Sequence, residues 1–331
     1  MIKFIVFADF HYRKEMYASR VVHLEKILDA AYIENVDFVV HVGDLCNDYF
    51  RSPELLYAYL SNKYNLSVFG VYGNHELEAE CNTMEYISKR LSNRDIIFAS
   101  DEDGYWHYDI GMYRILGLDT NYSYDRKNNL WEHNRTRSHG APRGNEFENS
   151  LSPKQIEWLE IRLSEAQKEN KKVIIFSHVG FCPWWEKTPD ADQVTCLFNK
   201  YQSSIILAVS GHIHSDDFKV WDNIPYFNVN AAINGCWLEQ DEDHYSERHK
   251  YVYDEYDEEG NLISSQERSI NNLTQAKNTW FFDDPLYAVV TVNDDGEIYI
   301  KGKKTKWMHG VAPSKIYYGC KPEIENRRYK K

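Results

Sequence analysis

Aspartate, asparagine and histidine recur directly after apolar runs at five places in the chain. The five stretches are Asp9-Phe10-His11, Gly43-Asp44, Gly73-Asn74-His75, Ser177-His178 and Gly211-His212-Ile213-His214. A single aspartate at such a place is usually a helix cap, and a single histidine is usually an ordinary hydrogen-bonded polar residue. The repetition of such residues at five places favours one shared site over five separate structural roles. Carboxylate, amide and imidazole groups suit borderline divalent metals such as Mn, Fe or Zn, so the pattern predicts a metal centre.

The apolar runs that precede these stretches have the length and composition of buried strands. They are Ile2–Phe7, Phe38–Val42, Val68–Tyr72, Val173–Phe176 and Ile205–Val209, and Tyr113–Leu118 is another run of this kind. Each run is too short for a helix and is rich in β-branched residues. Helical patterns lie between several of them, as in 16–34, which predicts an α/β fold with parallel strands. Ligands bind such sheets at the carboxyl ends of the strands, where the five stretches would meet.

The clearest predicted helix begins at Ser152-Pro153-Lys154-Gln155. Ser152 can cap the helix, Pro153 suits its first turn, and Gln155 can complete a capping box. Ile156, Leu159, Leu163 and Ala166 follow at helical spacing. This stripe predicts packing against the core rather than a cofactor site.

Two segments interrupt the alternation of strands and helices. Residues 121–150 are polar and aromatic and contain several arginines, which predicts a lid-like loop. Residues 239–279 are acidic and rich in tyrosine, with a turn signal at 259–261, which predicts an inserted hairpin. A terminal hairpin is expected over 286–301. Because no internal repeat or flexible linker is visible, we expect one domain over 1–331 with these two insertions.

The acidic balance of the chain limits its partners. A formal net charge of −13 repels polyphosphate backbones, so nucleic acid is not an expected partner. The basic stretches Lys301–Lys306 and Arg327–Lys331 are typical of solvated surface and tail. Six cysteines without a CxxC pair indicate reduced thiols. No signal peptide and no membrane-spanning stretch are recognisable, so we expect a cytoplasmic protein without a membrane partner. The oligomeric state stays open.

The five stretches resemble the sequence pattern of the calcineurin-like metallophosphoesterase superfamily. That pattern is D-x-H, GD-x-x-(D/N), GNH-(D/E), H and GHxH, and the chain supplies DFH, GDLCN, GNHE, SH and GHIH in the same order. The segments LSPKQIEWLE and YAVVTVNDDGEI also look like the bacterial branch that includes cyclic-nucleotide phosphodiesterases. The motifs cover little of the chain but extend from Asp9 to His214.

The resemblance implies a four-layer α/β/β/α sandwich of two mixed sheets, with two divalent or mixed-valence metal ions (Mn, Fe or Zn) at one edge. One ion would take Asp9, His11 and His214, the second would take Asn74, His178 and His212, and Asp44 would bridge both. The implied reaction is attack by a metal-bound hydroxide on a small phosphomonoester or phosphodiester, such as a nucleotide. Two ions about 3.5–4 Å apart can hold this nucleophile and neutralise phosphoryl oxygens. His75 matches the catalytic histidine of the family and would protonate the leaving oxygen.

One position departs from the phosphoprotein phosphatases within this superfamily. Their third residue after the bridging aspartate is also aspartate and pairs with the catalytic histidine, whereas this chain has Asn47. A neutral partner stabilises the imidazolium less, so His75 would be more acidic. The asparagine argues against a phosphoprotein phosphatase more than against catalysis.

The motifs leave the substrate open. Trp184 could stack a base or sugar beside the site, or it could simply pack a loop on the core. A nuclease is an alternative, and the net acidity counts against it. A non-catalytic scaffold on the same fold is a second alternative, and the retention of His75 and of every expected ligand counts against that one.

Overall fold

The computed structural model describes residues 1–11, 21–45, 64–75, 96–97, 104–125, 129–133, 147–182, 191–237, 250–256, 262–269, 279–310, 312–313 and 320–331. The predictions for Asn47, for Trp184 and for the arginines of 121–150 lie outside these residues. Within them, no helix has the length and apolar character needed to cross a membrane.

The body of the molecule contains two mixed β-sheets. The first has the strand order β20-β19-β18-β1-β2-β3-β4. Its strands are β1 (Ile2–Phe7), β2 (Phe38–Val42), β3 (Val68–Val71), β4 (Ile96–Ile97), β18 (Ala288–Val292), β19 (Ile298–Lys301) and β20 (Arg327–Tyr329). Strands β1 to β4 are parallel, and the terminal hairpin β18–β19 extends the sheet antiparallel to β1.

The second sheet has the order β12-β13-β11-β10-β6-β5. Its strands are β5 (Trp106–Ile110), β6 (Tyr113–Leu118), β10 (Lys172–Ser177), β11 (Ile205–Ser210), β12 (Asp217–Trp221) and β13 (Ile224–Asn228). The four central strands are parallel, and β5 and β12 run antiparallel at the two edges. Both sheets are therefore mixed, as expected.

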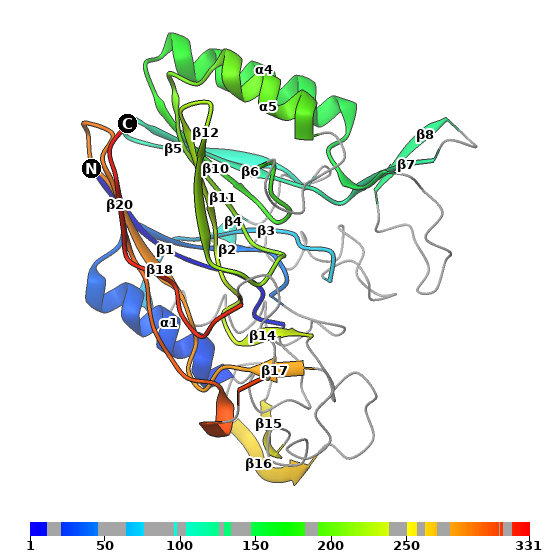
Figure 1. The fold of residues 1–331 in the computed structure, drawn as a ribbon, viewed down its shortest axis with the longest axis vertical. Helices are drawn as coiled ribbons and strands as arrows, with labels where there is room; N and C mark the ends of the chain where they lie inside the picture. The colour runs from blue at the N-terminus through cyan, green and yellow to red at the C-terminus, as the bar shows by residue number, and fades with distance from the viewer. Residues whose placement is uncertain are drawn as a thin grey trace.

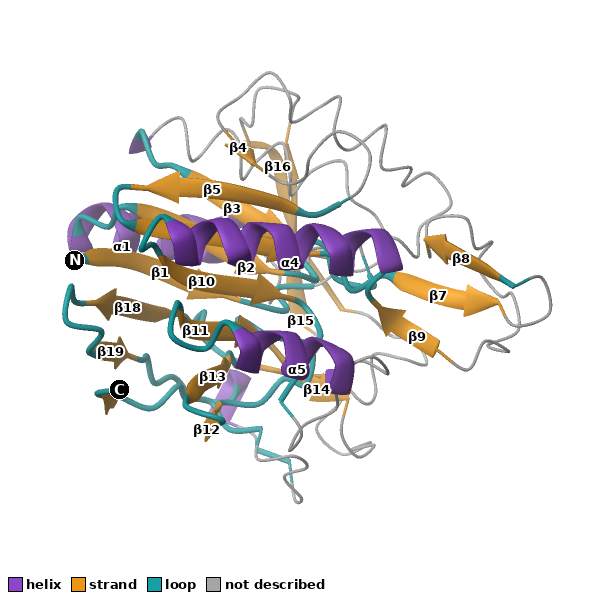
Figure 2. Ribbon diagram, turned by 90° about the horizontal axis from the view of Figure 1, so that it is seen from above, coloured by secondary structure: helices purple, strands orange, loops and turns teal. Residues whose placement is uncertain are grey.

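Helices cover the outer faces of the stacked sheets. They are α1 (Val21–Glu34), α4 (Pro153–Lys168) and α5 (Ala191–Lys200). A short 3₁₀ helix is formed by residues Met308–Gly310. Figure 1 shows α4 and α5 over the second sheet and α1 beneath the first sheet, and Figure 2 shows α4 and α5 lying across their sheet from above. This arrangement confirms the predicted four-layer α/β/β/α sandwich.

The continuous apolar runs of the sequence arise because the central strands are buried on both faces. In β10, Ile174 and Phe176 pack between the two sheets, where the Phe176 ring meets the edge of Phe4 with a centroid distance of 5.6 Å. Val173 and Ile175 point to the other side and pack with Leu159 and other residues of α4 and α5. A strand with two buried faces lacks polar alternation. The packing on both faces fixes the strand ends relative to one another.

Smaller sheets lie outside the sandwich. Strands β7 (Tyr122–Asp125), β8 (Leu130–His133) and β9 (Phe147–Ser150) form an antiparallel sheet within the segment predicted as a lid-like loop, and Figure 1 shows it projecting to one side. Strands β15 (Lys250–Tyr256) and β16 (Leu262–Ser269) pair as an antiparallel hairpin within 239–279. Strands β14 (Asn234–Trp237) and β17 (Thr279–Phe281) flank that insert in the chain and pair with each other in antiparallel fashion.

The start of α4 corrects one detail of the sequence prediction. Ser152 caps the helix, since its side chain accepts a hydrogen bond from the backbone N–H of Gln155 at 3.2 Å. The side chain of Gln155 does not complete a capping box. Its Oε1 accepts from the backbone N–H of Asp119 at 2.9 Å, and its Nε2 donates to the Asp119 carbonyl at 2.8 Å. Because Gln155 is buried, it favours a partner that satisfies both amide atoms over a cap that would satisfy one.

Candidate functional site

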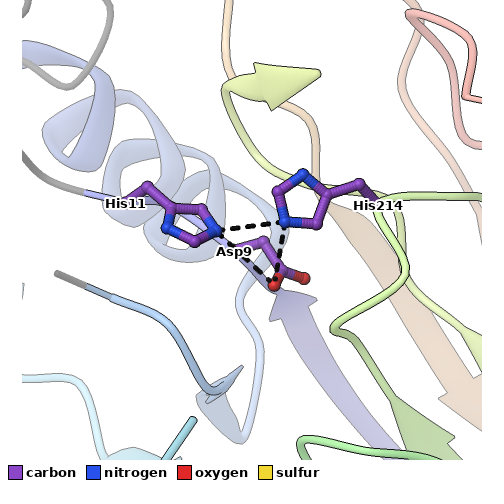
Figure 3. A group of neighbouring side chains, drawn as sticks. All are labelled: Asp9, His11 and His214. Carbon is purple, nitrogen blue, oxygen red and sulfur yellow. Dashed lines mark hydrogen bonds and ion pairs between the residues drawn. The ribbon is translucent and has the colours of Figure 1, made fainter. Parts of the chain in front are cut away.

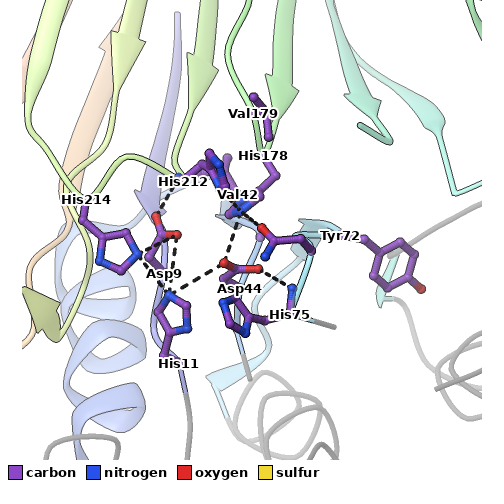
Figure 4. A network of polar contacts seen from close by, with 12 residues as sticks. Asp9, His11, Val42, Asp44, Tyr72, His75, His178, Val179, His212 and His214 are labelled. Carbon is purple, nitrogen blue, oxygen red and sulfur yellow. Dashed lines mark hydrogen bonds and ion pairs between the residues drawn. The ribbon is translucent and has the colours of Figure 1, made fainter. Parts of the chain in front are cut away.

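All five predicted stretches lie at the carboxyl ends of their strands. Asp9 and His11 follow β1, Asp44 follows β2, and Asn74 and His75 follow β3 in the first sheet. His178 follows β10, and His212 and His214 follow β11 in the second sheet. Figure 4 shows that the aspartates and histidines among them point toward one another, and Oδ1 of Asn74 lies 3.2 Å from Nε2 of His178. The structure therefore brings the predicted residues together from both sheets.

The first group of donor atoms consists of Asp9, His11 and His214, drawn in Figure 3. Nε2 of His11 lies 3.0 Å from Nε2 of His214. Oδ1 of Asp9 lies 3.4 Å from His214 Nε2 and 3.9 Å from His11 Nε2. Two imidazole nitrogens and a carboxylate oxygen thus surround one point, with one histidine supplied by each sheet.

The second group is centred on His178. Its Nε2 lies 3.2 Å from Asp44 Oδ2, 3.2 Å from Asn74 Oδ1 and 3.1 Å from His212 Nδ1. Its other ring nitrogen, Nδ1, donates to the carbonyl of Val42 at 2.8 Å. A backbone carbonyl on the second nitrogen is the usual way in which a protein orients a metal-binding histidine.

The spacing of both groups fits metal coordination. Metal–ligand bonds of about 2.0–2.2 Å place neighbouring ligand atoms about 3 Å apart when the bonds are at right angles. Four of the distances in the two groups, between 3.0 and 3.2 Å, agree with this value, whereas Asp9 Oδ1 lies farther from the two histidines of its group, at 3.4 and 3.9 Å. Asp44 lies between the groups, because its Oδ2 is also 3.7 Å from His11 Nε2. The donors can therefore hold a pair of metal ions that share Asp44.

The electrostatics of the site favour a positive occupant. Burial lowers the pKa of His11 to about 3 and that of His212 to about 4, so both rings are neutral at pH 7 and offer lone pairs. Burial would raise the pKa of Asp44, but the positive charges of His178 and His75 hold it well below its usual range. Burial also opposes the charge on His178, yet the Asp44 carboxylate raises the pKa of that ring to about 10. The Asp44 carboxylate is therefore charged and attracts cations, and Nε2 of His178 must lose its proton before it can bind a metal ion.

His75 lies beside both groups. Its backbone N–H donates to Asp44 Oδ1 at 2.9 Å, and its ring meets the ring of His11 edge-on with a centroid distance of 4.8 Å. Donor atoms of His11, Asp44 and His75 also lie within 4.8 Å of one another. The geometry thus places His75 at the site, while its predicted role as a general acid stays a prediction.

The backbone at the strand ends is unusual. Asp9, His11, Asp44, His212 and His214 have φ between +47° and +72°, in the left-handed region that side-chain-bearing residues seldom adopt. Aspartate and histidine tolerate this region better than most residues, and such conformations concentrate at functional sites. These left-handed residues bend the chain just after β1, β2 and β11 and keep their side chains at the sheet edge.

Two glycines permit close approach between the loops. A Cβ built on Gly43 would lie 2.3 Å from His178 Nδ1, and one on Gly73 would lie 2.0 Å from Asp44 Oδ1. Both distances are far inside van der Waals contact. The glycines before Asp44 and Asn74 are therefore required by packing.

A sixth strand end contributes residues that the sequence reasoning missed. Asp119, Thr120 and Asn121 follow β6 and are buried. Nδ2 of Asn121 donates to the carbonyl of Tyr72 at 3.1 Å, and Oγ1 of Thr120 accepts from the N–H of Val179 at 3.3 Å. These bonds hold the loops that carry His75 and His178. The sequence contains a signal for them, because Tyr113–Leu118 is a predicted strand and the polar residues after it could have been grouped with those that follow the other strands.

Comparisons with known proteins identify the family of the chain and support its fold. The profile of the family described as "Calcineurin-like phosphoesterase" matches residues 2–216. The manganese-dependent ADP-ribose/CDP-alcohol diphosphatase of Arabidopsis thaliana is 24% identical over 221 residues, which are 56% of this chain and 67% of that protein. The crystal structure of a dimetal phosphatase from Danio rerio superposes with a TM-score of 0.60 at 15% identity, over 93% of this chain and 98% of that chain. That structural likeness supports the fold.

The matched segment covers more than half of the chain and contains all five stretches. The family assignment also agrees with the two sheets and with donor groups able to hold two metal ions. The protein therefore belongs to the calcineurin-like phosphoesterase family and is a metal-dependent phosphoric ester hydrolase.

Proposed function

We propose that the protein hydrolyses a small phosphorylated molecule at a dinuclear metal site built on the two donor groups. Asp9, His11 and His214 would hold one ion, Asn74, His178 and His212 the other, and Asp44 both. The observation that supports this most directly is the position of Asp44. Its Oδ2 lies 3.2 Å from Nε2 of His178, in the second donor group, and 3.7 Å from Nε2 of His11, in the first donor group.

The protein groups would share the chemical work with the metal pair. When bound, two metal ions activate water and neutralise the charge of phosphoryl oxygens. Oδ1 of Asp44 accepts a hydrogen bond from the backbone N–H of His75, and this bond would hold the His75 ring beside the bound substrate. The ring can then give a proton to the leaving oxygen, a role worth about 10²–10⁴-fold in rate. The buried surroundings of Asp9 and Asp44 strengthen their attraction for the cations.

For the substrate, we propose a nucleoside diphosphate derivative. The Arabidopsis thaliana relative is named for ADP-ribose and CDP-alcohols, both of which contain a diphosphate linked to a nucleoside. A diphosphate offers adjacent anionic oxygens to a pair of cations. The net charge of −13 disfavours a long polyanion such as nucleic acid, which counts against the nuclease alternative.

A substrate screen with defined metals tests the proposal. Metal-free protein is reloaded with Mn, Fe, Zn or Mg and assayed with ADP-ribose, a CDP-alcohol, 4-nitrophenyl phosphate and bis(4-nitrophenyl) phosphate. We expect Mn-dependent hydrolysis with a preference for the diphosphates. Loaded protein that cleaves none of these compounds would contradict the proposal.

Two substitutions test the assigned roles. His75→Ala should keep the metal content of the wild type and lose about 10²–10⁴-fold in turnover. His107→Ala is the matched control, because His107 is an exposed histidine on β5 outside the site. Asp44→Asn should reduce the content of both ions, as measured by elemental analysis. Wild-type turnover by His75→Ala would refute its role as the acid, and full occupancy in Asp44→Asn would refute the shared ligand.

A further inference from the structure

The loop that carries His212 and His214 begins and ends beside the same residue. The chain leaves β11 at Ser210 and re-enters the sheet in β12 at Asp217, and β13 lies between these two strands. Asn228, the last residue of β13, is the register partner of Ser210 on one side and of Asp217 on the other. One short side chain can therefore reach both ends of the loop.

The side chain of Asn228 makes both of these contacts. Its Oδ1 accepts a hydrogen bond from the hydroxyl of Ser210 at 3.1 Å, and its Nδ2 donates to the carbonyl of Ser215 at 2.6 Å. The side chain is buried. The next residue, Val229, adds a backbone bond from its N–H to the Ser210 carbonyl at 2.7 Å. The loop is thus closed by an amide that uses its acceptor at one end and its donor at the other.

The conformation of the loop explains why such a closure matters. His212 and His214 both have left-handed backbone, with φ of 72° and 48°. Side-chain-bearing residues keep this conformation only where the surroundings hold it. The beginning of the loop is also held by the bond from His212 N–H to Asp9 Oδ2 at 3.0 Å. Asn228 adds a restraint at the end of the loop, after His214.

We propose that Asn228 is a positioning residue that sets the spacing of His212 and His214, an inference that rests on the proposed dinuclear site. His212 belongs to the second donor group and His214 to the first. Loosening the loop should therefore weaken the binding of both ions together. The chemistry requires an amide here, because aspartate has no N–H for the Ser215 carbonyl and an aliphatic side chain has neither a donor nor an acceptor.

Mn²⁺ binding to the metal-free full-length protein tests the proposal, with Mn²⁺ alone as the probe. Asn228→Ala should weaken the dissociation constants of both ions by about 10–100-fold, as is usual when the groups that orient metal ligands are lost. Asn228→Asp should come close to this value, since it keeps the acceptor for Ser210 but loses the donor. Isothermal titration or equilibrium dialysis gives both constants.

Asn230→Ala is the matched control. Asn230 is also buried and lies two residues further along the chain, but its Nδ2 donates to the carbonyls of Lys321 and Glu323 in the C-terminal segment. Its substitution should cost similar stability in thermal unfolding while leaving both Mn²⁺ constants within about twofold of the wild type. Equal weakening by Asn228→Ala and Asn230→Ala, or no weakening by Asn228→Ala, would overturn the proposal.

A milder variant covers the case in which Asn228→Ala does not fold. Ser210→Ala removes only the hydroxyl bond at the start of the loop, and it should weaken both constants severalfold. Unchanged constants in this variant would then overturn the positioning role. Wild-type protein that binds two Mn²⁺ ions but cleaves no phosphoester would count against the proposed function alone, since the affinity comparison does not depend on turnover.

Discussion

A methyl group added at Gly73 should disable the site through its collision with Asp44. The Cβ of an alanine there would lie 2.0 Å from Asp44 Oδ1 and 2.5 Å from Asp44 N, whereas real Cβ atoms essentially never come closer than 3.0 Å. The carboxylate must therefore move by about 1 Å. Metal–ligand distances tolerate only about 0.2 Å, and an error of 1 Å in a reacting group can cost about 10²-fold in rate. We expect Gly73→Ala to lose at least this much turnover and to bind both Mn²⁺ ions more weakly.

The assay combines a Mn²⁺ titration with initial rates on bis(4-nitrophenyl) phosphate. Gly111→Ala is the control, because a Cβ on Gly111 would meet nothing within 4 Å. Its φ of 56° makes the substitution cost about 1–2 kcal/mol of stability through backbone strain, without disturbing the site. Turnover and Mn²⁺ affinity within twofold of the wild type in Gly73→Ala would refute the reasoning, since they would show that Asp44 does not need its present position.

Three further changes probe the scaffold. Hydrogen bonds from the Arg114 guanidinium hold the pKa of Asp109 well below its usual range, so this carboxylate stabilises the fold above about pH 4 and loses that effect as the pH falls further. Asp109→Asn should cost up to about 2 kcal/mol at pH 7 and progressively less in acid, as urea unfolding at several pH values would measure. Asn121→Ala removes the buried bond to the Tyr72 carbonyl and should cost about 1–3 kcal/mol and lower turnover, whereas unchanged turnover would contradict its link to His75. Leu163→Ala, in the contact between α4 and the second sheet, should cost about 2–5 kcal/mol of unfolding free energy while Mn²⁺ affinity stays constant.

The sequence was sufficient to predict the central strands of the two sheets and to single out the polar residues that follow them. The run Ile205–Val209 is apolar throughout because both faces of this strand are buried, and this makes it recognisable without a partner strand. The polar residues that follow it stand out by contrast. Asp9 and His212 follow strands of different sheets, and the stacking of the two sheets brings them to the same edge, where the backbone N–H of His212 donates to Asp9 Oδ2. The rule that strand ends converge needs no knowledge of strand order.

The supporting residues could not be assigned from the sequence, because an amide side chain takes its role from its neighbours in space. Gln155 fits a capping box by its spacing, and only the fold reveals that Asp119 offers it two bonds. Asn228 lies in a strand whose neighbours follow from sheet topology rather than from local pattern. The strands of 122–150 were missed because polar and aromatic residues such as Tyr122–Asp125 lack the apolar continuity of the core strands.

The two donor groups each combine side chains from both layers of the sandwich. His11 and His214 come from opposite sheets, as do Asp44 and His178. A bound metal pair would then link the two sheets at the edge that carries the donor groups. A chelator should consequently lower the melting temperature as well as the rate, and both should recover along the same manganese titration. The melting temperature and the rate of this enzyme would then both report on the same metal-mediated link between the two sheets.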